Sequence, residues 1–127
     1  MSDRVAVVGS RVWRPAWMVW AFIDTLDAGS TIVSGGAPGA DTMAWAHVMN
    51  HRLGRYSVDE KAAEWQDYGK AAGPMRNARI VEDSDWGVAF WDGKVEHSGT
   101  LDCVRKFMAA GKCVVVIWNR GSECRTS

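Results

Sequence analysis

Short runs of β-branched and other apolar residues alternate along the chain with longer segments of helical periodicity. Such runs are typical of buried strands, and apolar residues that recur every three or four positions are typical of helices packed on a sheet. The strands are expected at residues 5–8, 31–36, 55–60, 85–91 and 112–118. The helices are expected at residues 15–26, 39–54, 74–84 and 99–111, with residues 62–73 irregular. This alternation predicts a mainly parallel sheet of about five strands with helices on both faces, in a Rossmann-like, doubly wound α/β fold.

The length of 127 residues fits one domain, which we expect to span residues 1–118 and to be followed by a C-terminal tail at residues 119–127. The formal net charge is zero, so no overall basic field draws the chain to nucleic acid or to an anionic membrane. No apolar run has the length of a transmembrane helix, and the first residues do not resemble a signal peptide. A membrane partner is therefore not expected, and nucleic acid is a less favoured partner than a small molecule.

The three cysteines, Cys103, Cys113 and Cys124, show no paired CxxC spacing. This odd number without a metal-ligand pattern favours a reducing, cytoplasmic setting, and we expect neither a metal site nor a cofactor. The chain also has eight tryptophans. Most of them are expected to fill a core around the small sheet.

Polar and glycine-rich segments follow three of the expected strands. Gly9, Ser10 and Arg11 follow the first strand, residues 34–41 follow the second, and Trp91 and Asp92 end the fourth. In open parallel sheets, ligands bind beyond the carboxyl ends of the strands, where such segments meet. The sequence therefore predicts one binding rim.

The segment after the second strand is the richest in glycine, and it leads directly into a helix. Its candidate ligand-binding residues are Ser34, Gly35, Gly36, Ala37, Gly39, Ala40 and Asp41. Glycines at such a turn let backbone N–H groups approach an anion, and the following helix adds its positive end. Simple turn geometry explains the glycines equally well. Asp41 near the helix start is either a cap for the first amides or a contact to a sugar hydroxyl, because it would repel a phosphate.

Further candidates lie near the starts of two later helices. Ser98, Gly99 and Thr100 repeat the glycine-and-hydroxyl pattern, with an ordinary helix cap as the alternative interpretation. Two guanidinium groups come from Arg11 and Arg76, and each can bind phosphate or carboxylate with two parallel hydrogen bonds. Asn77 adds a side-chain amide.

Aromatic side chains near the rim offer a possible surface for a base. Trp13 and Trp91 adjoin the first and fourth strands, and either could stack on a base. The alternative for these two residues and for Trp65 is packing in the core or in a dimer. The three histidines form neither a catalytic triad nor a metal-ligand spacing, and no nucleophile–base pair is evident.

The strings VAVVGSR, IVSGGAPGADTMAWAH, PMRN, FWDG and SGTLDCV, in this order, resemble the YspA-type branch of the SLOG superfamily. This superfamily includes the SMF/DprA DNA-processing proteins and the LOG phosphoribohydrolases, and the resemblance covers residues 4–117. It implies a Rossmann-like domain that forms homodimers and binds nucleotides or nucleotide-derived ligands at the predicted rim. Its members cleave a base from a nucleoside monophosphate, sense nucleotide signals or hold single-stranded DNA.

One position departs from the LOG pattern. SGTLDC lies where LOG enzymes carry PGGxGTxxE, and Cys103 occupies the position of the hydrolytic glutamate. A thiol does not stabilise an oxocarbenium ion as a carboxylate does, and the adjacent Asp102 is turned by about 100° on a helix. A replacement carboxylate would have to enter from elsewhere, and Asp41, Asp92 and Glu64 are the candidates. Arg76, which suits phosphate binding, is the fourth candidate catalytic residue.

Three functions therefore remain open from the sequence. The favoured one is a binding or sensing module for a nucleotide-derived small molecule, because the hydrolytic glutamate is missing while the anion-binding features are present. The second is a nucleotide N-glycosidase or phosphoribohydrolase that uses a substitute carboxylate. The third is single-stranded DNA binding, which would depend steeply on salt.

Overall fold

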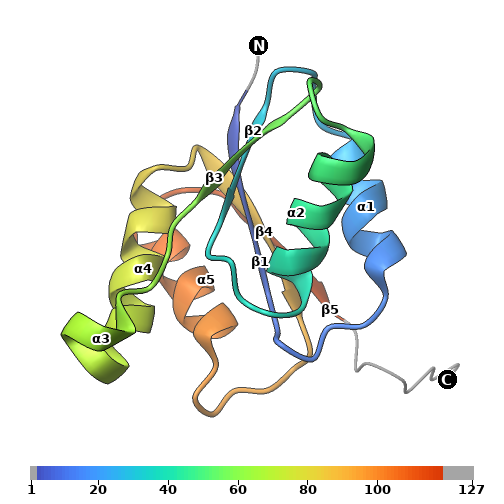
Figure 1. The fold of residues 1–127 in the computed structure, drawn as a ribbon. Helices are drawn as coiled ribbons and strands as arrows, with labels where there is room; N and C mark the ends of the chain where they lie inside the picture. Colours follow the sequence, from blue (N-terminus) through green and yellow to red (C-terminus); the bar gives the residue numbers. More distant parts are fainter. Residues whose placement is uncertain (1–2, 119–127) are drawn as a thin grey trace, which may run out of the picture.

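The computed structural model describes residues 3–118, which form a five-stranded, all-parallel sheet flanked by helices (Figure 1). The strand order is β3-β2-β1-β4-β5. The strands are β1 (Arg4–Gly9), β2 (Thr31–Ser34), β3 (Ser57–Glu60), β4 (Trp86–Trp91) and β5 (Val114–Trp118). The helices are α1 (Ala16–Asp24), α2 (Ala40–His51), α3 (Trp65–Tyr68), the 3₁₀ turn η1 (Gly69–Ala71), α4 (Ala72–Glu82) and α5 (Gly99–Ala109). The predicted α/β class and doubly wound architecture are confirmed.

The two faces of the sheet have separate cores because successive side chains of a strand point to opposite faces. Val5 and Val7 of β1 pack with residues of α1 and α2, whereas Ala6 and Val8 pack with Ile80, Phe107 and their neighbours on α4 and α5. Figure 1 shows α1 and α2 on one side of the sheet and α4 and α5 on the other. The continuous apolar run of β1 is therefore explained by burial on both faces.

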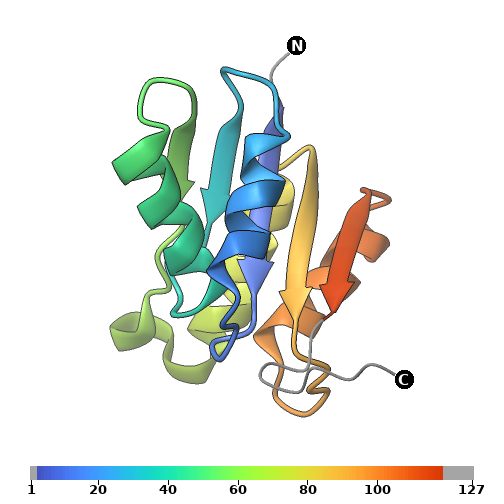
Figure 2. The same ribbon diagram turned by 90° about the vertical axis from the view of Figure 1, so that its right-hand side faces the viewer.

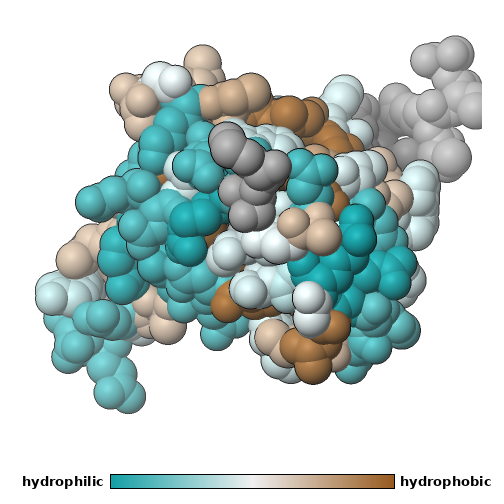
Figure 3. Space-filling model, turned by 90° about the horizontal axis from the view of Figure 1, so that it is seen from above, coloured by the Kyte–Doolittle hydropathy of each residue, from teal (hydrophilic) through white to brown (hydrophobic). Residues whose placement is uncertain are grey.

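All strands run in the same direction, so their carboxyl ends lie at one end of the sheet (Figure 2). Residues after these ends can converge on a single site, as expected from the sequence. The opposite end of the molecule, seen in Figure 3, is mostly hydrophilic, and its hydrophobic residues lie in separate areas.

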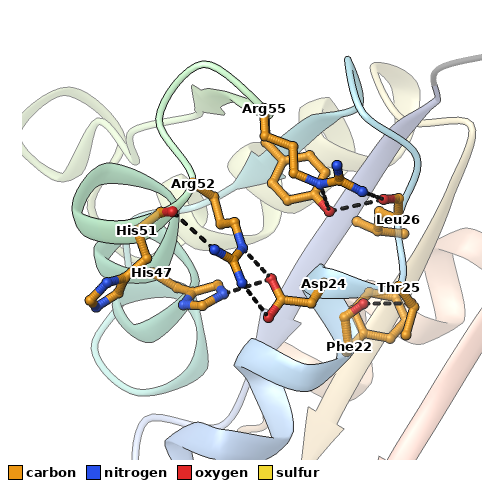
Figure 4. Close-up of polar contacts among 9 residues, drawn as sticks. Phe22, Asp24, Thr25, Leu26, His47, His51, Arg52 and Arg55 are labelled. Carbon is orange, nitrogen blue, oxygen red and sulfur yellow. Dashed lines mark hydrogen bonds and ion pairs between the residues drawn. The ribbon is translucent and has the colours of Figure 1, made fainter.

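A polar cluster joins the end of α1 to α2 on one face of the molecule (Figure 4). The Asp24 carboxylate accepts hydrogen bonds from His47 Nε2 at 2.9 Å and from Arg52 Nε at 2.8 Å. The Arg52 hydrogen bond, with His47 beside it, lowers the pKa of Asp24 from 3.8 to about 2 despite the opposing effect of desolvation. The Trp20 ring stacks on His47 with ring centres 5.6 Å apart. His47 is thus occupied in helix packing.

The sequence predicted an irregular segment at residues 62–73, but the structure places α3, η1 and the start of α4 there. α3 is a single turn with no buried residue, so no apolar periodicity could reveal it. Pro74 lies in the first turn of α4, where its missing N–H costs nothing. The predicted tail at residues 119–127 lies outside the described residues.

The expectation that most tryptophans fill the core is wrong. Trp13 is buried and packs edge-to-face on Phe90 with ring centres 5.3 Å apart. Five others are exposed on helices or at the end of β5, namely Trp17, Trp20, Trp45, Trp65 and Trp118. Within residues 3–118, no helix has the length and apolar character needed to cross a membrane.

Candidate functional site

A cavity of about 300 Å³ lies at the carboxyl ends of β1 and β4, bordered by the start of α5 and by α4. Eleven residues predicted from the sequence line it: Gly9, Ser10, Arg11, Ala37, Asp41, Arg76, Asn77, Asp92, Ser98, Gly99 and Thr100. It is also lined by five residues that were not predicted, Val8, Val12, Ile80, Lys94 and His97. The structure thus brings the segments after β1, β2 and β4 together with α4.

The remaining candidates lie behind the cavity wall or away from it. Ser34, Gly35, Gly36, Gly39 and Ala40 are not part of the lining. Trp91 is half-buried, and its indole N–H donates to the carbonyl of Lys94 at 2.9 Å, so it shapes its own loop. Glu64 lies by a second hollow between α3 and α4, 3.9 Å from Arg79.

The segment after β1 is bound to the end of β4 through Ser10. The Ser10 amide donates to the carbonyl of Phe90 at 2.9 Å, and the Ser10 hydroxyl accepts the Asp92 amide at 3.0 Å. A Cβ at Gly9 would lie 2.5 Å from the Cβ of Ala40. Gly9 and Ser10 therefore act first as structural residues, and Arg11 is the exposed charged group of this segment.

The glycines of the β2–α2 turn (residues 35–39) make room for protein neighbours. A Cβ at Gly35 would lie 2.9 Å from Arg76 Nε, and one at Gly36 would lie 2.8 Å from the Glu60 carboxylate. At Gly39, which has φ of +89°, a Cβ would lie 2.2 Å from the carbonyl oxygen of Ser10. Close packing within the chain therefore requires these glycines, and their interpretation as clearance for a ligand phosphate stays a prediction.

Asp41 holds the β2–α2 turn from inside. Its carboxylate accepts the Gly35 amide at 2.9 Å and the Ser34 hydroxyl at 3.3 Å, rather than capping α2. Burial raises its pKa from 3.8 to about 6, and the Gly35 amide and the Arg76 charge oppose this rise. Asp41 is thus a buried carboxyl group at the cavity wall that gains its charge in the weakly acidic range.

Arg76 of α4 lies flat against Gly35, with its Cδ, Nε and Cζ all within 3.1 Å of the position that a Cβ would take. Its Nη1 donates to the Gly35 carbonyl at 3.3 Å, and its Nε is buried with no hydrogen-bond partner in the described structure. The glycine thus lets α4 place a guanidinium group in the cavity wall. Asn77 is committed differently, because its amide donates to the Gly99 carbonyl at 3.1 Å and to Asp102 at 2.9 Å.

The start of α5 is the open part of the site. Ser98 caps the helix by accepting the Leu101 amide at 3.1 Å, which confirms the helix-cap interpretation. A Cβ at Gly99 would meet nothing within 4 Å, so this backbone faces free space. The amides of Gly99 and Thr100 have no partner inside the helix, because the first N–H groups of any helix have none. His97, directly before the cap, has φ of +53°, which is uncommon for a residue with a side chain.

Cys103, which the resemblance aligns with the LOG glutamate, is buried in the core between the sheet and α5. Burial, reinforced by the nearby Asp41 charge, raises the pKa of the Cys103 thiol to about 12, so it is not a nucleophile. The adjacent Asp102 pairs with Lys106 at 2.7 Å and with Asn77. Neither residue supplies a carboxylate to the cavity.

No group of three or more histidine, cysteine or acidic side chains within residues 3–118 is placed to hold a metal ion. The missed cavity residues Lys94 and His97 belong to a loop without periodicity. Their only sequence signal is their position between a strand end and a helix cap.

The chain is similar to the Gene 61 protein of Mycobacterium phage D29. The two are 37% identical over 119 residues, which is 88% of this chain and 94% of the relative. No family model matches the chain. No solved structure matches it either. Because the identity extends over nearly the full length of both proteins, the chain belongs to the family of the Gene 61 protein of Mycobacterium phage D29.

Proposed function

We propose that the protein binds a nucleotide or a nucleotide-derived small molecule in the cavity at the carboxyl ends of the strands. The observation that carries this proposal is that Arg76, held against Gly35, shares one cavity with the uncovered start of α5 at Gly99. A helix start offers unpaired amides and the positive end of the helix dipole, and both favour a phosphate. A guanidinium group in the same wall adds charged hydrogen bonds.

The charges around the cavity favour an anionic ligand. Arg11, Arg76 and Lys94 line it together with two carboxylates, those of Asp41 and Asp92. Both acidic groups are engaged within the protein, because Asp41 binds the β2–α2 turn and Asp92 accepts the Lys94 amide at 3.0 Å. The cations are therefore the groups left to meet a ligand.

The cavity volume supports a ligand of limited size. About 300 Å³ is at the lower end of the range for small-molecule sites. Such a space accommodates a phosphate and its sugar, with the base reaching the rim near Val12 and His97. The resemblance of the motif order to the SLOG superfamily supports the same ligand class.

The test is calorimetric titration with nucleoside monophosphates, ADP-ribose, cyclic nucleotides and inorganic phosphate. Arg76→Gln should weaken the binding of the best ligand by at least about tenfold, because a charged hydrogen bond contributes roughly 1.5–3 kcal/mol. Arg105→Gln, which changes an exposed arginine on α5 outside the cavity, is the matched control and should leave the affinity unchanged. Absence of binding by every compound would refute the proposal.

The same samples distinguish binding from hydrolysis. Cys103 is buried, and Asp41 and Asp92 are engaged within the protein, so we expect the nucleotides to be recovered intact. Release of free base, abolished in Asp41→Asn, would instead assign the protein to the phosphoribohydrolases.

A further inference from the structure

β5 is an edge strand whose sequence carries no protection against pairing. Among residues 3–118, β4 is the strand that pairs with it, so the backbone groups on its outer side face away from the sheet. Its five residues, Val114–Trp118, are all apolar. Val115 and Val116 are each 43% exposed, although they point to opposite faces of the sheet. An exposed, uncharged edge of this kind is a template for another strand.

The other edge of the same sheet is protected. β3 ends in Asp59 and Glu60, and Asp59 forms ion pairs with Arg4 and Lys61. Lys61 also contacts Asp83 at 2.5 Å. Charges on and around an edge strand oppose pairing with other chains, because they would lose water or meet like charges. Within residues 3–118, ion-paired charges thus lie on and beside β3, whereas β5 itself carries no charged side chain.

Within residues 3–118, little of the chain covers β5. Figure 2 shows α1 in front of β1, whereas no helix of the described residues lies in front of β5. On the other face, Val114 packs with the core that includes Phe107 of α5, while Val116 remains exposed.

We propose that β5 pairs with β5 of a second copy of this chain and joins the two sheets into one continuous sheet. A two-fold axis perpendicular to the sheet brings the same edge of both copies together as antiparallel neighbours. With the axis at Val116, this residue lies opposite its own copy, and Val115 lies opposite Ile117 of the partner subunit. Each of these pairs is apolar, and cross-strand pairs of β-branched residues stabilise a sheet.

The first test is the mass in solution, measured by sedimentation over a range of protein concentrations. The wild-type chain should be a dimer, and Val116→Lys should weaken the dimer by at least about tenfold, because the change places two ammonium groups directly opposite each other. Leu53→Lys changes an apolar residue that is 73% exposed beyond the other edge and should leave the dimer intact. A monomeric wild type, or a Val116→Lys variant that dimerises normally, overturns the proposal.

The second test does not depend on a weakened dimer. In a background with Cys113→Ser and Cys124→Ser, Val116→Cys should form a disulfide between copies under mild oxidation, because a residue on the two-fold axis faces itself within bonding reach. Leu53→Cys in the same background is the control and should not cross-link. Equal cross-linking of both variants would indicate random collision and contradict the assigned edge. Circular dichroism of Val116→Lys shows whether the fold is retained.

Discussion

The β2–α2 turn and the start of α5, which follows the β4–α5 loop (residues 92–98), meet at one cavity, but their glycines have opposite surroundings. In the first, three glycines are pressed against Arg76, Glu60 and Ser10 of the same chain. At the start of α5, a Cβ at Gly99 would meet nothing within 4 Å. The turn is packed against its own chain, whereas the start of α5 leaves backbone uncovered.

This difference shows that a glycine-rich turn after a strand is not by itself a phosphate site. Glycine removes a side chain, and the space can be taken by a ligand or by the protein. At Gly35 the space is taken by Arg76, so the turn contributes to the cavity indirectly, through the arginine that it seats. The direct backbone contribution comes from the start of α5.

The largest expected effect is a difference in the free energy of unfolding between alanine substitutions at the packed Gly39 and at the open Gly99. Gly39→Ala forces a side chain into a left-handed backbone and against the Ser10 carbonyl, so we expect a loss of at least about 3 kcal/mol in the free energy of unfolding. Gly99→Ala, on a helical backbone facing open space, should leave it unchanged or raise it by up to about 1 kcal/mol. Urea denaturation of both variants measures this. Equal losses would remove the distinction between the two glycines.

The next effect concerns the buried carboxyl group of the packed turn. The folded-state pKa of Asp41 is about 6, above the value of 3.8 that applies to an exposed aspartate. Between these two pKa values the folded chain binds more protons than the unfolded chain. The stability that protonated Asp41 contributes is therefore complete below the unfolded-state pKa and is lost as the pH rises through the folded-state pKa.

Asp41→Asn removes this titration. From about pH 4 to about pH 7, the wild-type chain should lose on the order of 3 kcal/mol of stability relative to the variant, because each pKa unit corresponds to about 1.4 kcal/mol. The measurement is the difference in free energy of unfolding between the two proteins at each pH. A difference that does not change with pH would mean that the Asp41 carboxylate is not desolvated in the folded protein.

The smallest expected effect concerns the open loop. Ser98→Ala removes the hydroxyl that accepts the Leu101 amide, so the free energy of unfolding should fall by about 1 kcal/mol. Ser98→Asp keeps an acceptor at the cap and should retain most of the stability, with weaker binding of anionic ligands because it adds a negative charge at the cavity. Thermal unfolding and titration of both variants provide the two readouts. An unchanged melting temperature in Ser98→Ala would show that the cap does not hold the loop.

Several features were predictable from the sequence because they depend on local chemistry. Apolar runs such as that of β1 require burial on both faces, and their alternation with helical segments implies a parallel sheet whose carboxyl ends meet. The Ser98 cap and the positions of most cavity-lining residues follow from this pattern. α3 was missed because a single exposed turn has no periodicity, and Lys94 and His97 were missed because a loop has no pattern to read.

What the sequence by itself determined is therefore the order of strands and helices and the end of the sheet at which the polar segments collect. Only the tertiary structure decided what fills the space beside each glycine, because Arg76 lies 41 positions from Gly35 along the chain and reaches it through the packing of α4 on the sheet. It also decided that Cys103 faces the core and that β3 and β5 form the two edges of the sheet. Local periodicity sets which residues form an element, whereas contacts between distant elements set which atoms are left for a ligand or a partner.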